Sequence, residues 1–208
     1  MKLSRRALLV SGFASLTLAT GCVGSGSYRT YYAEPIAPDV SRGWRVVDVR
    51  VAVPESLTVS EAATLVPRAD IVWREDPAGD RRAQVATIMR AAIKRGASGL
   101  RGPRGVYLDV TMTRFHALTF EAETRLSNAG VHNIDFVATI VDAASGATLA
   151  GPVEIEASLP ALSGDQMRAA RARGETQKSQ ISAHVARVIA GWLGTGPDLR
   201  RNFTRSGD

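Results

Sequence analysis

Three histidines, His116, His132 and His184, are the side chains of this sequence best suited to proton transfer near neutral pH. His116 and His132 flank a connection that also carries Glu121 and Glu123. If the strands on either side of this connection pair as a hairpin, the two imidazoles would face each other across it. With one of the glutamates they would then form a metal site or an acid–base site. One hypothesis is therefore a hydrolase or a metal-dependent enzyme that uses these four residues.

The spacing of the same residues favours a protein that is not an enzyme. No HExxH, CxxC or GxSxG motif is present, and no two of the His and Glu candidates stand four residues apart. His184 falls at the edge of an apolar helical stripe, where a histidine is more often a packing residue than a ligand. The glycine-rich residues 96–105 follow a helix and enter a strand, which is typical of turns and not of a phosphate-binding loop. We therefore expect no catalytic residues, no metal and no cofactor.

The single cysteine, Cys22, ends an apolar run near the start of the chain in the sequence LATGC. Lys2, Arg5 and Arg6 precede an uncharged run, residues 7–20. That run is shorter than the roughly 20 residues that span a bilayer, but it is long enough for the apolar part of a signal peptide. A lone cysteine beside a Gly- and Ser-rich segment has no disulfide partner, so a covalent modification explains it best.

The LATGC segment resembles the lipobox of bacterial lipoproteins, although Ala19 stands where the commonest pattern has leucine. In that family a signal peptidase cleaves before the cysteine, which then carries fatty chains such as palmitate. The resemblance implies that residues 1–21 are a lipoprotein signal peptide and that Cys22 is the lipidation site. Two or three chains on one residue suffice for stable anchoring.

The resemblance also implies a compartment. Val23, where aspartate would retain a Gram-negative lipoprotein at the inner membrane, implies an outer-membrane anchor facing the periplasm. The periplasmic side of the inner membrane is the alternative. The SRRALL segment, residues 4–9, is similar to a twin-arginine signal, so the export route stays open between that pathway and the general secretory one.

The charge of the chain bears on its partners. The sequence has 26 basic and 20 acidic residues, and removal of residues 1–21 leaves 23 basic residues against the same 20 acidic ones. The arginines are scattered, without the clustered basic face of a nucleic-acid-binding protein. The expected partners are therefore the lipid bilayer, through acylated Cys22, and envelope proteins or lipid, with no nucleic acid. The oligomeric state stays open.

The elements that would position these residues form one domain. Residues 22–43 are rich in Gly, Ser and Pro and are expected to be a flexible tether. Its three tyrosines are expected either to remain in that coil or to rest on the membrane or the domain. Residues 44–194 predict a single globular domain. The polar residues 195–208 are expected to be a disordered tail.

Alternating apolar and polar residues predict five strands, and two segments have helical periodicity. The strands are expected at residues 44–54, 71–74, 105–115, 131–142 and 147–159. One helix is expected over residues 81–95, between the caps Asp80 and Gly96. A longer one is expected from Ser163, where Gln166 fits a capping box, to Gly194, with a break at Gly174.

The predicted order, β-β-α-β-β-β-α, indicates an α+β fold. We expect a two-layer sandwich in which a largely antiparallel sheet carries both amphipathic helices on one face. Residues 116–130 predict either a hairpin or a long loop. Pro152 cannot donate to a strand ladder, so the last strand is expected to have an edge or a bulge there.

This arrangement, with a lipobox before it and DAASGATL at the last hairpin, resembles the small domain of several Gram-negative envelope lipoproteins. Some are auxiliary subunits of lipid-transport or outer-membrane assembly systems, and many belong to uncharacterised families. The resemblance implies a non-enzymatic binding or assembly module. It would act through the open sheet edge near Pro152, through the solvated sheet face, or through a groove that holds a lipid chain. A periplasmic hydrolase and a binder of cell-wall polymer are the alternatives.

Overall fold

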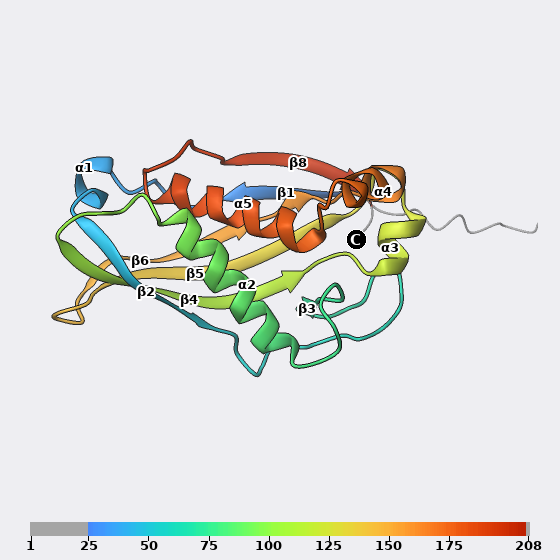
Figure 1. Ribbon diagram of the computed structural model, residues 1–208, viewed down its shortest axis with the longest axis horizontal. Coiled ribbons are helices and arrows are strands. Elements are labelled where there is room, and N and C mark those ends of the chain that lie inside the picture. The colour runs from blue at the N-terminus through green and yellow to red at the C-terminus, as the bar shows by residue number, and fades with distance from the viewer. Residues whose placement is uncertain (1–24, 207–208) are drawn as a thin grey trace, which may run out of the picture.

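The computed structural model describes residues 25–206, which form a sheet with two long helices packed on it (Figure 1). The predicted signal peptide and Cys22 lie outside the described residues. The α+β class and the two-layer arrangement are confirmed.

The sheet contains eight strands. They are β1 (Ser25–Tyr31), β2 (Trp44–Ala52), β3 (Ile71–Val72), β4 (Arg104–His116), β5 (Val131–Asp142), β6 (Thr148–Ala157), β7 (Leu159–Pro160) and β8 (Arg201–Ser206). Their order is β2-β4-β5-β6-β1-β8, with β3 beside β4 and β7 beside β5. β4, β5 and β6 form the expected antiparallel meander, whereas β2 and β3 run parallel to β4.

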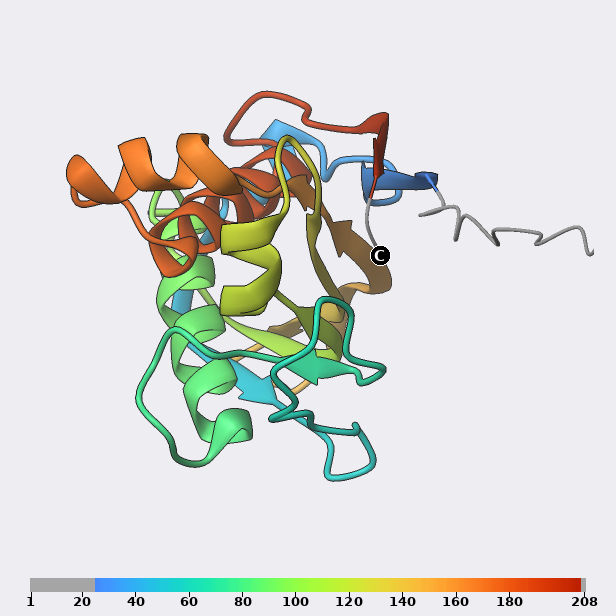
Figure 2. The same cartoon turned by 90° about the vertical axis from the view of Figure 1, so that its right-hand side faces the viewer.

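Two long helices, α2 (Arg81–Gly96) and α5 (Gln177–Trp192), cover one face of the sheet (Figure 2). The shorter helices lie toward the ends of the molecule. They are α1 (Pro38–Ser41), α3 (Phe120–Arg125) and α4 (Gly164–Ala172). Within residues 25–206 no helix covers the opposite face, and none is long and apolar enough to cross a membrane.

The helix α2 follows its prediction almost to the residue. Asp80 caps it, because its carboxylate accepts a hydrogen bond from the backbone N–H of Ala83 at 3.1 Å. Gly96 is not the expected cap, since it is the last helical residue. A Cβ atom there would lie 2.4 Å from the carbonyl oxygen of Ala186 on α5. Gly96 therefore permits the close approach of the two helices.

The long C-terminal helix is two helices, α4 and α5, and the predicted break at Gly174 is confirmed. Gly174 has a φ of +81°, a conformation that glycine adopts without strain. The capping box predicted at Ser163 is wrong, because its hydroxyl donates to the carbonyl of Ala129 instead. A capping box forms at the start of α5, where the side chains of Thr176 and Ser179 each accept from the other residue's backbone N–H.

The core lies between the sheet and the two long helices. Along β4 and β5 buried residues alternate with more exposed ones, as a strand with one covered face requires. Trp73 and Phe115 meet edge to face at 5.6 Å and are fully buried. The peptide bond before Pro152 is cis, and the β5–β6 register shifts nearby, so the irregularity predicted there is confirmed.

The expected flexible tether is wrong for residues 25–43. β1 pairs with β8 along its length and with β6 at Thr30 and Tyr31. Tyr28 and Tyr32 are buried, while Tyr31 is largely exposed. The Tyr32 hydroxyl donates to a carboxylate oxygen of Asp198 at 2.9 Å. Docking on the domain, one of the outcomes expected for the tyrosines, is therefore confirmed for Tyr28 and Tyr32.

The expected disordered tail is also wrong over residues 201–206. These residues form β8, and Phe203 stacks on Tyr28 with ring centroids 5.9 Å apart. Each of the two terminal strands satisfies the backbone hydrogen bonds of the other, which polar segments alone in solution could not do. The folded domain therefore extends from residue 25 to 206 and not from 44 to 194.

Candidate functional site

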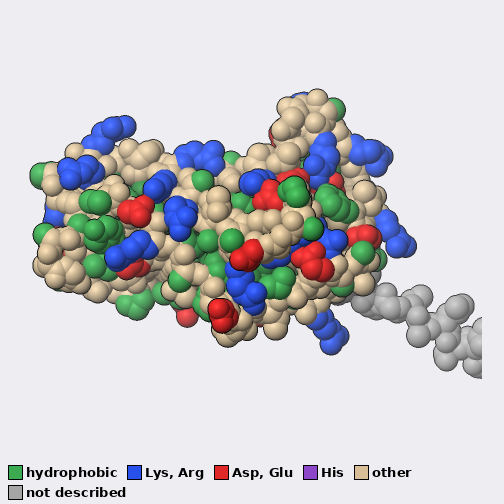
Figure 3. All heavy atoms as spheres, turned by 60° about the horizontal axis from the view of Figure 1, so that its bottom comes forward, with side chains coloured by type: hydrophobic (Ala, Val, Ile, Leu, Met, Phe, Trp, Pro, Cys, Tyr) green, Lys and Arg blue, Asp and Glu red, His purple; other side chains and the backbone are tan. Residues whose placement is uncertain are grey.

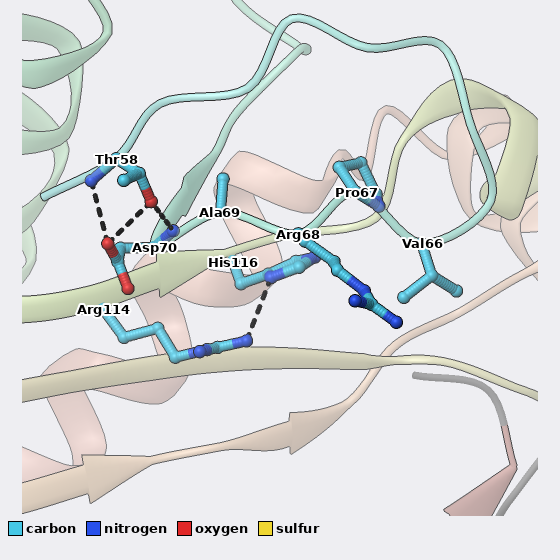
Figure 4. Close-up of a pocket in the computed structure, with 8 residues that line it drawn as sticks. All are labelled: Thr58, Val66, Pro67, Arg68, Ala69, Asp70, Arg114 and His116. Atoms are coloured by element: carbon cyan, nitrogen blue, oxygen red, sulfur yellow. Dashed lines mark hydrogen bonds between the residues drawn. The ribbon is translucent and has the colours of Figure 1, made fainter.

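A pocket of about 440 Å³ opens between the C-terminal end of β4 and the loop of residues 58–70 (Figure 4). Its lining combines two arginines and a histidine with one carboxylate and several apolar groups. These residues are Thr58, Val66, Pro67, Arg68, Ala69, Asp70, Arg114 and His116. His116 is the one member that the sequence analysis singled out.

Arg114 and His116 at the end of β4 line this pocket because Phe115 between them points into the core. Phe115 is fully buried against Trp73, so its two neighbours on the strand point the other way. The β4–β5 register shifts between Met112 and Arg114, which brings Arg114 directly opposite Asp135.

The loop over the pocket is fixed by Asp70. Its carboxylate accepts hydrogen bonds from the backbone N–H of Thr58 at 2.8 Å and from the Thr58 hydroxyl at 2.7 Å. The same hydroxyl accepts from the backbone N–H of Asp70 at 3.0 Å. These bonds lower the pKa of Asp70, because they stabilise its charged form. Asp70 therefore clamps the loop and does not act as a free base.

The cationic groups of the pocket differ in their partners. Arg114 Nη2 lies 3.2 Å from His116 Nδ1, so the guanidinium donates and the ring accepts (Figure 4). The charge of Arg114 adds to the lowering of the Asp70 pKa by Thr58, and it offsets part of the rise that burial causes in the pKa of Asp135. Arg68 is exposed and has no hydrogen bond or ion pair within residues 25–206. Arg68 is thus the cation free to meet an anionic group.

Asp135 lies on the helix-free face beside a smaller pocket of about 240 Å³, which Glu154 and Glu156 also line. One of its carboxylate oxygens is buried without a hydrogen-bond partner in the described part of the chain. Burial, and then the charge of Glu156, raise the pKa of Asp135 to about 6. Such a group carries its proton at mildly acidic pH.

Two clusters, each an arginine with a carboxylate and a tyrosine, lie on the helix-free face. Arg50 binds Asp109 through Nε and Oδ1 at 2.5 Å, and its guanidinium lies 4.2 Å from the ring centre of Tyr107. In the second cluster, Arg29 pairs with Glu156 and lies over the ring of Tyr31. Exposed ion pairs add only about 0–1 kcal/mol to stability. Each cluster holds charged and aromatic side chains of this face against one another.

The structure does not bring His116 and His132 face to face, so that expectation is wrong. The register places Asn133 opposite His116 and Leu159 opposite His132. His132 is fully buried, and neither of its ring nitrogens has a hydrogen-bond partner among the residues described. Burial lowers the pKa of His132 to about 3, so the ring is neutral at physiological pH.

The two glutamates do not complete a site with these histidines. Glu123 is buried on α3, where it accepts two hydrogen bonds at 2.8 Å from Arg171 and one from Gln177. Glu121 lies partly exposed on the same helix. Over residues 25–206 no group of three or more His, Cys, Asp or Glu side chains could hold a metal ion. Among the residues described, the four candidates therefore do not come together in the metal or acid–base site of the alternative hypothesis.

His184 packs against the sheet, as its position on the helical stripe predicts. It is buried, and its Nε2 lies 3.3 Å from the hydroxyl of Thr30 on β1. Burial, and then the charges of Arg187 and Arg201, lower the pKa of His184 to about 4.

Four residues of these two pockets were not predicted from the sequence: Arg68, Asp70, Arg114 and Asp135. Arg114 and Asp135 lie on strands in which apolar and polar residues alternate, so neither stands out by its residue type alone. No local signal marks Arg68 or Asp70, since their meeting depends on the parallel pairing of β3 with β4.

Comparison with known proteins identifies the family of this α+β domain. A family of unknown function, DUF6778, matches residues 44–207, and the chain belongs to it. No curated protein matches the chain.

Solved structures give partial likenesses. A putative lipoprotein from Caulobacter crescentus CB15 is 16% identical with a TM-score of 0.36, covering 70% of this chain and 90% of that one. A PelC dodecamer from Paraburkholderia phytofirmans is 11% identical with a TM-score of 0.32, covering 80% and 96%. TM-scores this low say nothing about what this chain binds.

Proposed function

We propose that this chain is an envelope lipoprotein, anchored by acylated Cys22 in the outer membrane and facing the periplasm. Its domain acts there as a non-enzymatic module that binds another envelope component. The LATGC sequence supports the anchor. The histidines and Glu123 support a role without catalysis, because His132, His184 and Glu123 serve packing and internal hydrogen bonds.

One observation carries the proposal: the first strand begins almost directly after the lipidation site. β1 starts at Ser25, so only Val23 and Gly24 separate it from Cys22. An extended chain spans at most about 3.3–3.6 Å per residue, so three steps reach about 10 Å. Fatty chains on Cys22 would hold one end of the sheet against the lipid headgroups. Such an anchor positions the domain instead of letting it swing on a long tether.

The helix-free face is the surface that we assign to the partner. It carries the Arg50 and Arg29 clusters and the pocket beside Asp135. The open sheet edges are less suited to strand addition. Charged Arg45, Asp48 and Arg50 lie on the edge strand β2, and Arg201 and Arg205 lie on the other edge strand, β8. β6 pairs with β1 only at its end, and Pro152 removes a donor from the part that β1 leaves open. Contact through side chains of the face therefore explains binding better than an added strand.

Two measurements in growing cells test this proposal. Wild-type protein should incorporate labelled palmitate and sediment with membranes, whereas Cys22→Ser should do neither. A photo-crosslinking residue at Thr111 or Glu154, both exposed on the helix-free face, should give a discrete higher-mass product. The matched control is Ala183, exposed on α5. Products from position 183 alone, or no palmitate in the wild type, would overturn the proposal.

A further inference from the structure

Three of the six large hydrophobic side chains that are exposed in the described part of the chain lie at one end of the molecule, and Figure 3 shows that hydrophobic side chains are also exposed along the rest of one face. Leu65, Val66 and Phe120 are 39%, 44% and 45% exposed, and we call these three residues the end patch. Single exposed apolar residues are ordinary, but a contiguous group marks an interaction site. The two segments are tied together, because the Thr119 hydroxyl donates to the carbonyl of Thr64 at 2.8 Å.

The end patch lies at the end of the sheet where β1 begins. Gly26 of β1 is paired with Arg205 of β8, whose guanidinium donates to the carbonyl of Ala161 at 3.0 Å. Ala161 packs with Leu118 and Ala122 in a small cluster under α3. Figures 1 and 2 show the start of β1, the end of β8 and α3 at this same end.

Hydrogen bonds and packing tie both segments of the end patch to the rest of the fold. Phe120 begins α3, which Thr119 caps and which Ala122 fastens to the small cluster from the buried side. Val66 precedes the buried Pro67 in the loop that Asp70 clamps. Both segments therefore hold their apolar side chains at the surface.

Unpaired positive charges flank the patch. Arg68 beside Val66 and Arg125 at the end of α3 are exposed, and neither has an ion pair or hydrogen bond in the described part of the chain. Glu121, partly exposed on the first turn of α3, is the acidic side chain closest in sequence to Phe120. Apolar groups between free arginines match the boundary between acyl chains and anionic headgroups.

We infer that the end patch inserts into the surface of the bilayer that holds Cys22, with Arg68 and Arg125 on its anionic headgroups. This inference rests on the proposed lipid anchor, because Cys22 would lie within about 10 Å of the start of β1. A protein partner is the poorer occupant, because a stable interface buries about 800 Å² on each side. Three side chains fall well short of that, but they add usefully to a lipid anchor that already exists.

Fluorescent labelling of the lipidated protein tests the inference. Cys22 is the only cysteine, and acylation blocks its sulfur, so Val66→Cys or Phe120→Cys supplies a single reactive thiol. Each variant is labelled with an environment-sensitive nitrobenzoxadiazole probe and reconstituted into vesicles of phosphatidylethanolamine and phosphatidylglycerol at about 3:1. The matched control is Val40→Cys, 50% exposed on α1 at the opposite end (Figure 1).

The expected result is a blue-shifted emission at positions 66 and 120, with quenching by spin-labelled lipid several-fold stronger than at position 40. Adding Leu65→Ser and Arg68→Gln should reduce the shift of the probe at position 120. Probes at 66 and 120 that behave like the one at 40, on protein that still floats with the vesicles, would overturn the inference and leave the anchor intact. If the proposed lipid anchor itself is wrong, the purified protein will carry no fatty acid, and this result is distinguishable from a failure of the end patch to insert.

Discussion

The buried, unpartnered His132 should set the acid stability of this domain. It has no exposed surface, both of its ring nitrogens lack partners among the described residues, and its pKa falls to about 3. We propose His132→Leu, which keeps a similar volume and removes both polar atoms. The matched control is His116→Gln, at the partly exposed pocket.

Proton linkage determines whether the free energy of unfolding rises or falls with pH. The unfolded chain binds a proton at His132 below its ordinary pKa of about 6.5, whereas the folded chain excludes it until about pH 3. Stability from this group is therefore complete above pH 6.5 and is lost as the pH falls. Between pH 7.5 and pH 5 the loss is about 2 kcal/mol. The variant should lack this loss and should also gain about 1–2 kcal/mol at pH 7.5, because no polar atom remains unpaired.

The assay is urea unfolding at pH 7.5 and pH 5, followed by tryptophan fluorescence, on mature chain carrying Cys22→Ser. The advantage of His132→Leu over the wild type should grow from about 1–2 kcal/mol at pH 7.5 to about 3–4 kcal/mol at pH 5. His116→Gln should show no such growth. An advantage of His132→Leu that is the same at both pH values would refute the reasoning, since it would mean that the folded protein protonates this ring.

Three further predictions concern stability. Asp135→Asn should raise the free energy of unfolding at pH 7.5 by about 1–3 kcal/mol. The pKa of Asp135 is about 6 in the folded chain and about 4 in the unfolded chain, so the wild-type protein loses stability as the pH rises from 4 through 6. Denaturation at pH 4 and pH 7.5 checks this, and an equal effect at both would contradict it. Deleting residues 201–208 should lower the free energy of unfolding by about 1–3 kcal/mol, because it uncovers Tyr28. Thermal unfolding measures this loss, and amide hydrogen exchange in β1 should become faster; unchanged exchange would contradict the prediction. Gly96→Ala should cost about 1–3 kcal/mol by pushing α2 from α5, whereas Gly99→Ala, with ordinary contacts, should be near neutral. Equal melting temperatures for the two variants would show that the helices can separate freely.

Local patterns were enough to predict the interior of the fold. The alternation in β4 and β5 and the helical period of α2 are strong because each element has one buried face. The terminal strands were not predictable in this way. β1 is a Gly- and Ser-rich segment and β8 is mostly polar, so each becomes a strand only because the other pairs with it.

The residues of the candidate site likewise depend on pairing between segments that are distant in the sequence. Alternation from Val106 to Met112 predicts Arg114 and His116 on the covered face, and the register shift after Met112 instead turns Phe115 into the core. The partners Arg68 and Asp70 come from a loop whose position depends on the parallel pairing of β3 with β4, a contact without a local signature. The His116–His132 pair failed for a related reason, since register decides which residues face each other and a shift of one residue reverses the result.

The most direct test of the account is the covalent state of the mature N-terminus. Trypsin cleavage after Arg29 releases residues 22–29, a peptide that mass spectrometry can identify in membranes of the native host. The account predicts that this peptide begins at Cys22 and carries the mass of two or three fatty chains with a glyceryl thioether. An unmodified peptide starting elsewhere, on protein that stays in the soluble fraction, would contradict the anchored function and the membrane contact of the end patch together.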